Sequence, residues 1–435
     1  MLDDLRQAAL RQRGERLLRS VVLGCKRLLS ERGETNSMVI ARDLIERIDE
    51  LEGWQLGAFF DYLAKDLSPD PKRVLHCAQA YAAAANATNL IALSQVSEPP
   101  RQELFRRLNR TPGGTSTVLR LRRALHLLLP KHPELAALES DLLHLLTSWF
   151  NPGFLRMQRV DWNSPAQLLE KIILHEAVHQ IDGWDDLRRR LQPDRRCFAF
   201  FHPQLPDEPL IFVEVALLPE MPAAIAPLID KLSTPMLGDK FRVAAFYSIS
   251  NCEPGLRGVS LGNFLIKSVA EQLRRELPRL KTFCTLSPVP GLAHWLLANP
   301  DFSTLPHLKR GLAADLDDAR EHLRAQLGGD LAALQGAAAH ERLDRESSAA
   351  MLSLASAYLL HLSPTAAGDP VARFHLDNGA RLERLNQRGN MSLKGLKQSF
   401  GIMVNYLYDL DKIEASHEKF KAGEVARSRA VHTLM

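Results

Sequence analysis

The stretch 245-AFYSISNCEPGLRGVSLGNFLIKSVAEQL-273 decides how the second half of this chain folds. Aromatic, β-branched and small residues predict a strand over 243–250, and a polar loop that contains Pro254 follows it. Amphipathic spacing then predicts a helix over 261–277. A loop that opens a helix presents free backbone N–H groups and the positive end of the helix dipole. The stretch therefore predicts a turn that is suited to bind a phosphate group.

Three residues of this turn carry the phosphate-binding interpretation. Gly258 and Gly262 lie about one helical turn apart, and a glycine lets the backbone approach oxygen atoms closely. Arg257 adds a fixed positive charge that can pair with a phosphate. A glycine-bearing turn before a helix also occurs for purely structural reasons, so the residues alone leave both interpretations open.

The strand-loop-helix stretch lies inside a longer alternation of strands and helices. The runs 197-CFAFFH-202, 209-PLIFVEVALL-218 and 282-TFCTLS-287 are rich in β-branched and aromatic residues, which predicts three more strands. Helical patterns return from about residue 300 to 370, and we interpret them as a helical insertion or lid. This order of elements predicts an α/β domain with a β-loop-α-β unit.

The N-terminal part of the chain follows a different pattern. Apolar residues recur at helical spacing, as in Leu44, Ile45, Ile48 and Leu51, and no convincing strand interrupts them. The Gly-rich piece 111-TPGGTSTVLRL-121 lacks the GK[ST] ending of a phosphate loop and follows a charged helix, so we interpret it as a helix-helix connection. The pattern predicts an all-helical module.

A change of pattern near 151-NPG-153 marks the expected domain boundary. Just beyond it, 164-SPAQ-167 offers a capping serine, a proline at the first helical position and a glutamine three residues after the cap. We therefore expect a helical domain over 1–152 and a second domain over 153–435.

The composition favours a soluble protein and argues against two classes of partner. Of the 435 residues, 55 are Lys or Arg and 51 are Asp or Glu, so the net charge is +4. A net charge this small on a protein of this size does not favour binding to nucleic acid. No run of about 18 apolar residues is present, so we expect no membrane span.

The location is predicted from the N-terminus and the cysteines. The opening residues MLDDLRQAALRQRGERLL have no apolar core of the kind that a secretory signal needs. The five cysteines are scattered, without a CxxC pair or zinc-ribbon spacing, which fits a reducing compartment. We therefore expect a cytoplasmic protein.

The stretch 174-LHEAVHQIDGWDD-186 contains the HExxH signature of zinc peptidases. On a helix, His175 and His179 would share one face and could both bind Zn²⁺, with Glu176 as general base. A convincing third ligand is missing, because a common continuation of the signature needs a histidine where Asp185 stands. We therefore interpret these residues as two histidines and a glutamate on a partly solvated helix, and we expect no metal.

Longer motifs resemble one fold and one family. The loop 257-RGVSLG-262 resembles the acyl-CoA pyrophosphate loop R/Q-x-x-G-x-G/A of the GNAT-like N-acetyltransferase fold, with Ser260 where the middle glycine usually stands. Six stretches resemble the malonyl-CoA decarboxylase family: 175-HEAVH-179, 195-RRCFAFFH-202, 245-AFYSIS-250, 257-RGVSLGNFLIK-267, 283-FCTLSPVPGL-292 and 373-RFHLDNGARLERLN-386. The resemblance covers both halves of the chain, including the helical N-terminal module.

The resemblance implies a fold and an assembly. It implies a multidomain α and α/β (α+β) protein, in which an N-terminal all-helical bundle precedes a GNAT-like mixed-sheet acyl-CoA domain with the helical insertion. It also implies assembly through the helical domain as a homodimer or homotetramer. The HExxH residues would lie on a helix of the catalytic domain without a zinc-binding role.

The resemblance further implies a reaction and its residues. Malonyl-CoA would lose CO₂ through a thioester enolate and become acetyl-CoA, a step of fatty acid metabolism that needs no metal or organic cofactor. Ser287 and His375 would form the catalytic pair, with Tyr408 in the same pocket. His375, titrating near neutrality, would protonate the carbanion, while Ser287 engages the carboxylate or relays a proton. The pyrophosphate loop would consist of Arg257, Gly258, Val259, Ser260, Leu261, Gly262 and Asn263.

Other interpretations stay open on the residues alone. An N-acyltransferase would use the same loop, but it usually needs an acidic base on the preceding strand, and 243–250 contains no carboxylate. A helical scaffold that senses acyl-CoA would bind without turnover, and a zinc peptidase would bind stoichiometric zinc. Without the resemblance, Ser287 could simply end its strand by local hydrogen bonding, and His375 could be structural.

Overall fold

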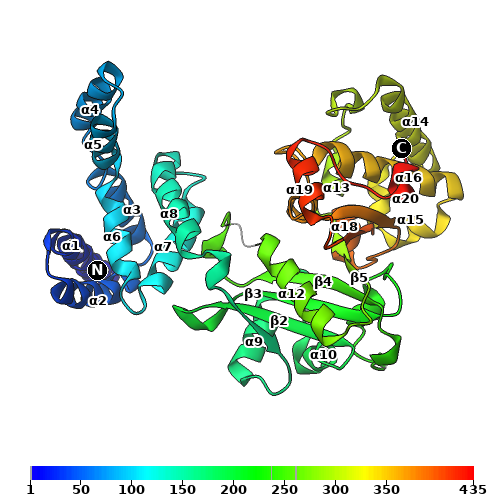
Figure 1. Ribbon diagram of the computed structural model, residues 1–435, viewed down its shortest axis with the longest axis horizontal. Coiled ribbons are helices and arrows are strands. Elements are labelled where there is room, and N and C mark those ends of the chain that lie inside the picture. Colours follow the sequence, from blue (N-terminus) through cyan, green and yellow to red (C-terminus); the bar gives the residue numbers. More distant parts are fainter. Residues whose placement is uncertain (1, 237, 260–261) are drawn as a thin grey trace. The chain divides into compact units, whose positions relative to one another are not determined.

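The computed structural model describes residues 2–236, 238–259 and 262–435 (Figure 1). Contacts divide the chain into two compact units. The helical unit comprises Met1–Arg156, Phe201–Glu208 and Glu253–Ser260. The sheet unit comprises Met157–Phe200, Pro209–Cys252 and Leu261–Met435. The helical unit thus includes two short pieces from later in the sequence, and the domain boundary expected at residue 152 stays a prediction.

The N-terminal part of the helical unit is all-helical, as the sequence predicted. Its helices are α1 (Leu2–Ser30), α2 (Glu34–Asp49), α3 (Trp54–Lys65), α4 (Pro71–Ala83), α5 (Ala87–Ser97), α6 (Pro100–Asn109), α7 (Gly114–Leu128) and α8 (Ala136–Trp149). Leucine, isoleucine and phenylalanine side chains fill the core, among them the fully buried Ile48, Phe59, Leu63 and Leu108. Burying this apolar surface is what holds the helices together.

The connection between α6 and α7 contains glycines for a steric reason. Gly113 has a φ of +83°, in the left-handed region that glycine adopts at little cost. A Cβ atom at Gly114 would lie 1.8 Å from the Leu108 carbonyl oxygen, which no side chain could tolerate. The Gly-rich piece is therefore a helix-helix connection, as predicted.

The sheet unit is built on a mixed β-sheet, and this confirms the predicted fold class. The strands are β1 (Arg156–Val160), β2 (Arg195–His202), β3 (Leu205–Leu218), β4 (Val243–Asn251), β5 (Thr282–Thr285), β6 (Ser287–Pro288), β7 (Arg381–Asn386) and β8 (Met403–Leu407). Among the described residues they pair in the order β1-β2-β3-β4-β5-β8-β6, with β7 on β8. β4 pairs with β3 antiparallel and with β5 parallel.

Helix α12 (Gly262–Glu276) connects β4 to β5, as the sequence predicted. The parallel pairing of these strands ends with Phe246 opposite Thr285, after which Leu286 donates its N–H to the Phe246 carbonyl oxygen at 2.9 Å. In the described part of the chain no later pair joins β4 to β5, so the two strands part here. Ser287 begins β6 just past this divergence.

The remaining helices of the sheet unit include those predicted for about 300–370. They are α9 (Ala166–His175), α10 (Gly183–Arg190), α11 (Ala226–Ile229), α13 (Leu292–Leu297), α14 (Arg310–Gln326), α15 (Ala337–Arg342), α16 (Arg345–Ala357), α17 (Pro370–Asp377), α18 (Leu393–Ser399), α19 (Ile413–Lys421) and α20 (Arg429–His432). A short π-helix, Tyr358–Leu362, continues α16. None of the helices described is long and apolar enough to cross a membrane.

Helix α9 ends at His175, which corrects the expectation that the HExxH residues lie together on one helix. Glu176 already has extended backbone angles, with φ −65° and ψ 108°, and no helix forms again before α10. Glu176 and His179 are also buried rather than partly solvated, each 7% exposed. His175 and His179 therefore do not share a helical face.

Candidate active site

Three side chains that were expected to act together meet inside the sheet unit. Ser287 lies in β6, His375 lies in α17, and Tyr408 directly follows β8. Ser287 Oγ lies 3.0 Å from His375 Nε2, and His375 Nδ1 lies 2.8 Å from the Tyr408 hydroxyl oxygen. One hydrogen-bonded chain thus joins residues that are 88 and 33 positions apart in the sequence.

Asp369 fixes the helix that carries His375. Its carboxylate accepts hydrogen bonds from two N–H groups in the first turn of α17, at 2.9 and 3.1 Å. The other carboxylate oxygen accepts the N–H of Gly291 at 2.9 Å, in the loop after Ser287. One buried carboxylate therefore connects the segment after Ser287 with the helix that carries His375. Asp369 was not among the residues predicted from the sequence, although Asp followed by Pro370 is a helix-start signal.

The hydrogen bonds define which nitrogen of His375 carries a proton. Ser287 donates its hydroxyl hydrogen to Thr285 Oγ1 at 2.9 Å, so the Ser287 oxygen must accept from His375 Nε2–H. Nδ1 is then the acceptor for the Tyr408 O–H. Thr285 Oγ1 also accepts the backbone N–H of Tyr406 at 3.2 Å, which anchors the chain in the sheet. The imidazole therefore presents a hydrogen-bond donor toward Ser287.

Burial keeps this imidazole neutral. His375 is 4% exposed, and its removal from water lowers its pKa to about 3. The expectation that His375 titrates near neutrality is therefore wrong for the ring in this structure. Tyr406 stacks on the imidazole with the ring centroids 4.7 Å apart. Burial likewise raises the pKa of Tyr408 above its usual range, so both rings are neutral at pH 7.

The predicted pyrophosphate loop is described in part. Arg257 is exposed, and Gly258 has a φ of +85°, a conformation that requires glycine. Ser260 and Leu261 lie outside the described residues, as does the Asn263 side chain. The backbone of Gly262 and Asn263 forms the first turn of α12, and Val259 precedes the gap.

Helix α7 holds the first part of this loop within the helical unit. The Arg122 guanidinium is 1% exposed and donates to the carbonyl oxygens of Gly255 at 2.6 Å and Arg257 at 2.7 Å. Glu139 accepts from the same guanidinium at 2.6 Å. A Cβ atom at Gly255 would lie 2.7 Å from the Leu119 carbonyl oxygen, so the loop lies directly against α7. Nothing in the local pattern distinguishes Arg122 from the other basic residues of α7, so Arg122 was not predicted from the sequence.

Family models match both parts of the chain. One, described as the malonyl-CoA decarboxylase C-terminal domain, matches residues 153–435. Another, described as the malonyl-CoA decarboxylase N-terminal domain, matches residues 67–150. The chain belongs to the malonyl-CoA decarboxylase family. The resemblance inferred from the motifs is therefore confirmed.

Named members of the malonyl-CoA decarboxylase family are similar along most of the chain. The mitochondrial malonyl-CoA decarboxylase of Mus musculus is 36% identical over 328 residues, which is 72% of this chain and 66% of the relative's length. The crystal structure of malonyl-CoA decarboxylase from Rhodopseudomonas palustris has a TM-score of 0.82 at 45% identity, covering 96% of this chain and 99% of the other. The enzyme from Cupriavidus metallidurans has a TM-score of 0.74 at 34% identity, covering 97% and 100%.

The HExxH residues of this family member do not form a metal-ligand set. In the described part of the chain, no group of three or more His, Cys, Asp or Glu side chains is arranged to hold a metal ion. The Glu176 carboxylate instead accepts the hydroxyl groups of Ser248 and Ser250, both in β4. The zinc-peptidase interpretation therefore loses the helical geometry on which it depended.

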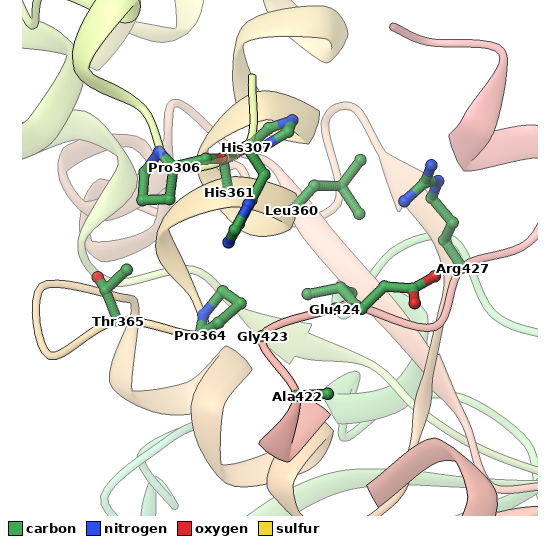
Figure 2. Close-up of a pocket in the computed structure, with 11 residues that line it drawn as sticks. Pro306, His307, Leu360, His361, Pro364, Thr365, Ala422, Gly423, Glu424 and Arg427 are labelled. Carbon is green, nitrogen blue, oxygen red and sulfur yellow. Dashed lines mark hydrogen bonds between the residues drawn. The ribbon is translucent and has the colours of Figure 1, made fainter. Parts of the chain in front are cut away.

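A separate pocket of the sheet unit has a volume of about 430 Å³. Figure 2 shows the side chains around it, which include His307, His361, Thr365, Glu424 and Arg427. The His361 ring is fixed because its Nδ1 lies 2.8 Å from the Pro306 carbonyl oxygen. None of the residues expected to act in decarboxylation lines this pocket, so it is distinct from the candidate active site.

Proposed function

We propose that this chain decarboxylates malonyl-CoA to acetyl-CoA and CO₂. The observation that supports the proposal most directly is the buried Ser287–His375–Tyr408 chain of hydrogen bonds, in a member of the malonyl-CoA decarboxylase family. Ser287 of this chain lies just past the point where the pairing of β4 with β5 ends.

The reaction needs three things from the protein. As the bond between the α-carbon and the carboxylate breaks, its electron pair moves into the thioester and gives an enolate. The protein must remove water from the carboxylate, stabilise the negative oxygen, and deliver one proton to carbon. Ser287 and His375, 5% and 4% exposed, provide a dry site with hydrogen-bond donors. The net reaction consumes one proton, which must reach the site with the substrate or after it.

His375 is the residue that we assign to this proton. A malonyl carboxylate placed beside the neutral imidazole favours the charged form and raises the His375 pKa, so a proton would be taken up as substrate binds. When CO₂ leaves, the negative charge moves to the enolate, and His375 Nε2–H protonates the carbon. Before CO₂ leaves, Ser287 engages the carboxylate, or it relays the proton in the later step, and Tyr408 holds Nδ1.

The CoA pyrophosphate is assigned to the loop before α12. Arg257 would supply charge, and the backbone N–H groups of Gly258, Val259, Leu261 and Gly262 would supply hydrogen bonds. The left-handed φ of Gly258 supports this assignment, because such a turn aims successive N–H groups to one side. The Arg122 contacts to the same loop support it further.

The test is acetyl-CoA and CO₂ release from malonyl-CoA by the purified chain in the presence of a strong chelator. We expect turnover that survives chelation and falls at least about 10²-fold in His375→Asn and in Ser287→Ala. Absence of turnover, or turnover that chelation abolishes, would refute the proposal. Tight CoA binding without turnover would favour the acyl-CoA sensor instead.

We also propose that the chain forms a homodimer or homotetramer through the helical unit. Helices α4 and α5 pack on each other but contain no buried residue. Leu75, Leu90 and Ile91 are 59%, 46% and 56% exposed, which is unusual for apolar side chains in one hairpin. Light scattering should give a multiple of 48.7 kDa for the chain and a smaller mass for Leu75→Asp/Ile91→Asp.

A cytoplasmic location and a role in fatty acid metabolism complete the proposal. The five cysteines, all among the described residues, form no disulfide, and four of them are buried. Burial raises the pKa of Cys25 and Cys284 to about 12, so these thiols stay protonated and unreactive, as suits a reducing compartment. Imaging of a tagged chain in its own cell would test the location, since curated relatives carry the word mitochondrial in their names.

A further inference from the structure

The HExxH segment is bound to strand β4 through the carboxylate of Glu176. Ser248 donates its hydroxyl hydrogen to this carboxylate, with distances of 2.8 and 2.7 Å to the two oxygens. Ser250 Oγ lies 3.1 Å from the second oxygen. Ser248 and Ser250 are 2% and 1% exposed, so these bonds are shielded from water and correspondingly strong.

The segment is itself rigid. Glu176 Oε1 also accepts the N–H of Val178 at 2.9 Å and of His179 at 2.7 Å, which closes a tight turn. Lys394, at the start of α18, donates its Nζ to the carbonyl oxygens of Ala177 at 2.8 Å and Val178 at 3.0 Å. The Glu176 carboxylate is thus held by backbone N–H groups of its own turn. This turn also explains why α9 ends before Glu176.

His179 reaches the irregular point of the same strand. Glu214 of β3 pairs with Ser248, whereas the next residue, Val215, pairs with Phe246. Tyr247 is therefore the extra residue of a β-bulge, whose backbone groups the ladder leaves without regular partners. The His179 ring lies close to the Tyr247 backbone, and its Nε2 has no hydrogen-bond partner among the described residues. Burial lowers the pKa of this ring to about 3, so it is neutral.

Among the described residues, the end of β4 beyond Phe246 has a neighbouring strand on one edge only, so contacts from outside the sheet must hold its other edge. Its pairing with β5 ends at Phe246, so residues 247–251 are paired with β3 only. The same residues run directly through Cys252 into the loop that we assign to the CoA pyrophosphate. Any sideways movement of β4 past its bulge would therefore displace the start of that loop.

We propose that Glu176 and His179 are positioning residues, which hold the bulged end of β4 and thereby set the affinity for the CoA part of the substrate. The proposal rests on the proposed function, because it assumes that CoA binds along β4 and the following loop. Ser287, His375 and Tyr408 are carried by β6, α17 and the segment after β8. Loss of the Glu176 contacts should therefore weaken binding and leave the chemical step unchanged.

The first test compares Glu176→Gln with the unaltered chain. We measure kcat and KM for malonyl-CoA and the Kd of CoA by calorimetry. We expect KM and Kd to rise together by about tenfold, because charge-assisted hydrogen bonds worth this factor are lost, and kcat to stay within about twofold. The pH dependence of kcat should not move, since Glu176 handles no proton.

Two controls separate positioning from stability. Ser248→Thr and Ser248→Val have nearly the same shape and differ in the hydroxyl group that binds Glu176, so Kd should rise in the valine variant relative to the threonine variant. Asp141→Asn removes a half-buried hydrogen-bonded carboxylate of the helical unit, which pairs with Arg101 at 2.6 Å, and should lower the melting temperature without changing Kd.

Each outcome decides a separate point. A Glu176→Gln variant that melts earlier with KM and Kd unchanged would overturn the positioning role. So would a fall in kcat with an altered pH profile, because that result would make Glu176 a group of the chemical step. If the unaltered chain does not decarboxylate malonyl-CoA, the proposed function fails. A CoA Kd that still depends on Glu176 and on the Ser248 hydroxyl would then leave the positioning role intact.

Discussion

Replacing Arg122 by methionine should release the first part of the loop that we assign to CoA from α7, within the helical unit. The change keeps a long side chain in a buried position and removes three contacts, to the carbonyl oxygens of Gly255 and Arg257 and to the Glu139 carboxylate. Breaking a buried ion pair costs roughly 3–5 kcal/mol. We expect about 3 kcal/mol, the lower end of this range, because Glu139 is 19% exposed and retains a contact with His126 at 3.0 Å.

This loss has two measurable consequences. A loss of about 3 kcal/mol in the free energy of unfolding lowers the melting temperature of a domain of this size by about 6–12 °C. The loop backbone, released from α7, must be ordered again by the substrate, and ordering one residue costs about 1–2 kcal/mol. We therefore expect the KM for malonyl-CoA to rise about tenfold or more, with kcat little changed.

Arg101→Met is the matched control. Arg101 is 3% exposed and donates to Asp141 at 2.6 Å and to Ser68 at 2.7 Å, in the helical unit but without a contact to the loop. Both variants should melt earlier, and only Arg122→Met should raise KM. Equal KM values in the two variants would refute the coupling, and Arg122→Lys, which keeps the charge, provides a milder variant if the methionine variant does not fold.

Other predictions concern the catalytic chain and the loop. Because His375 must gain a proton that it lacks at a pKa of about 3, kcat/KM should fall about tenfold per pH unit between pH 6 and 8, and a flat profile would contradict proton uptake. The depressed pKa also means that the unfolded chain binds a proton below pH 6.5 and the folded chain does not. The free energy of unfolding should therefore drop by about 2 kcal/mol more between pH 6.5 and 5 in the unaltered chain than in His375→Gln, as measured by urea titration. Tyr408→Phe removes the hydrogen-bond donor to His375 Nδ1 and should lower kcat about tenfold with KM unchanged. A tenfold fall in the affinity for CoA would instead mean that Tyr408 contributes to substrate binding. Gly258→Ala forces a φ of +85° on a residue with a Cβ atom and should raise the Kd of CoA several-fold, with His375 chemistry unaffected.

The parts of the fold that follow local pattern were predictable. The strand, the glycine-bearing loop and the helix of 243–277 depend on residue spacing and on turn residues, which act over a few positions. The helix-helix connection at 111–114 depends on glycine in the same local way. These interpretations required no knowledge of what lies across the fold.

The parts that depend on distant neighbours were not predictable from the residues. Ser287 and His375 meet across 88 positions, and only the family resemblance indicated the pair. The depressed pKa of His375 results from burial, which a turn signal beside Asn378 does not reveal. Arg122 resembles any basic residue of an amphipathic helix until the loop at Gly255 is placed beside it.

The HExxH stretch shows why a correct local pattern can still mislead. Its spacing suits a helix, but the Glu176 carboxylate finds stronger partners in two backbone N–H groups of its own turn and two serine hydroxyls of β4. Those bonds fix an extended Glu176 and end α9 at His175. A glutamate that accepts four donors is neither a free base nor half of a metal site. We therefore propose that the motif anchors the strand that leads into the loop assigned to CoA. The separation of KM from kcat in Glu176→Gln is the measurement that distinguishes a positioning residue from a catalytic one.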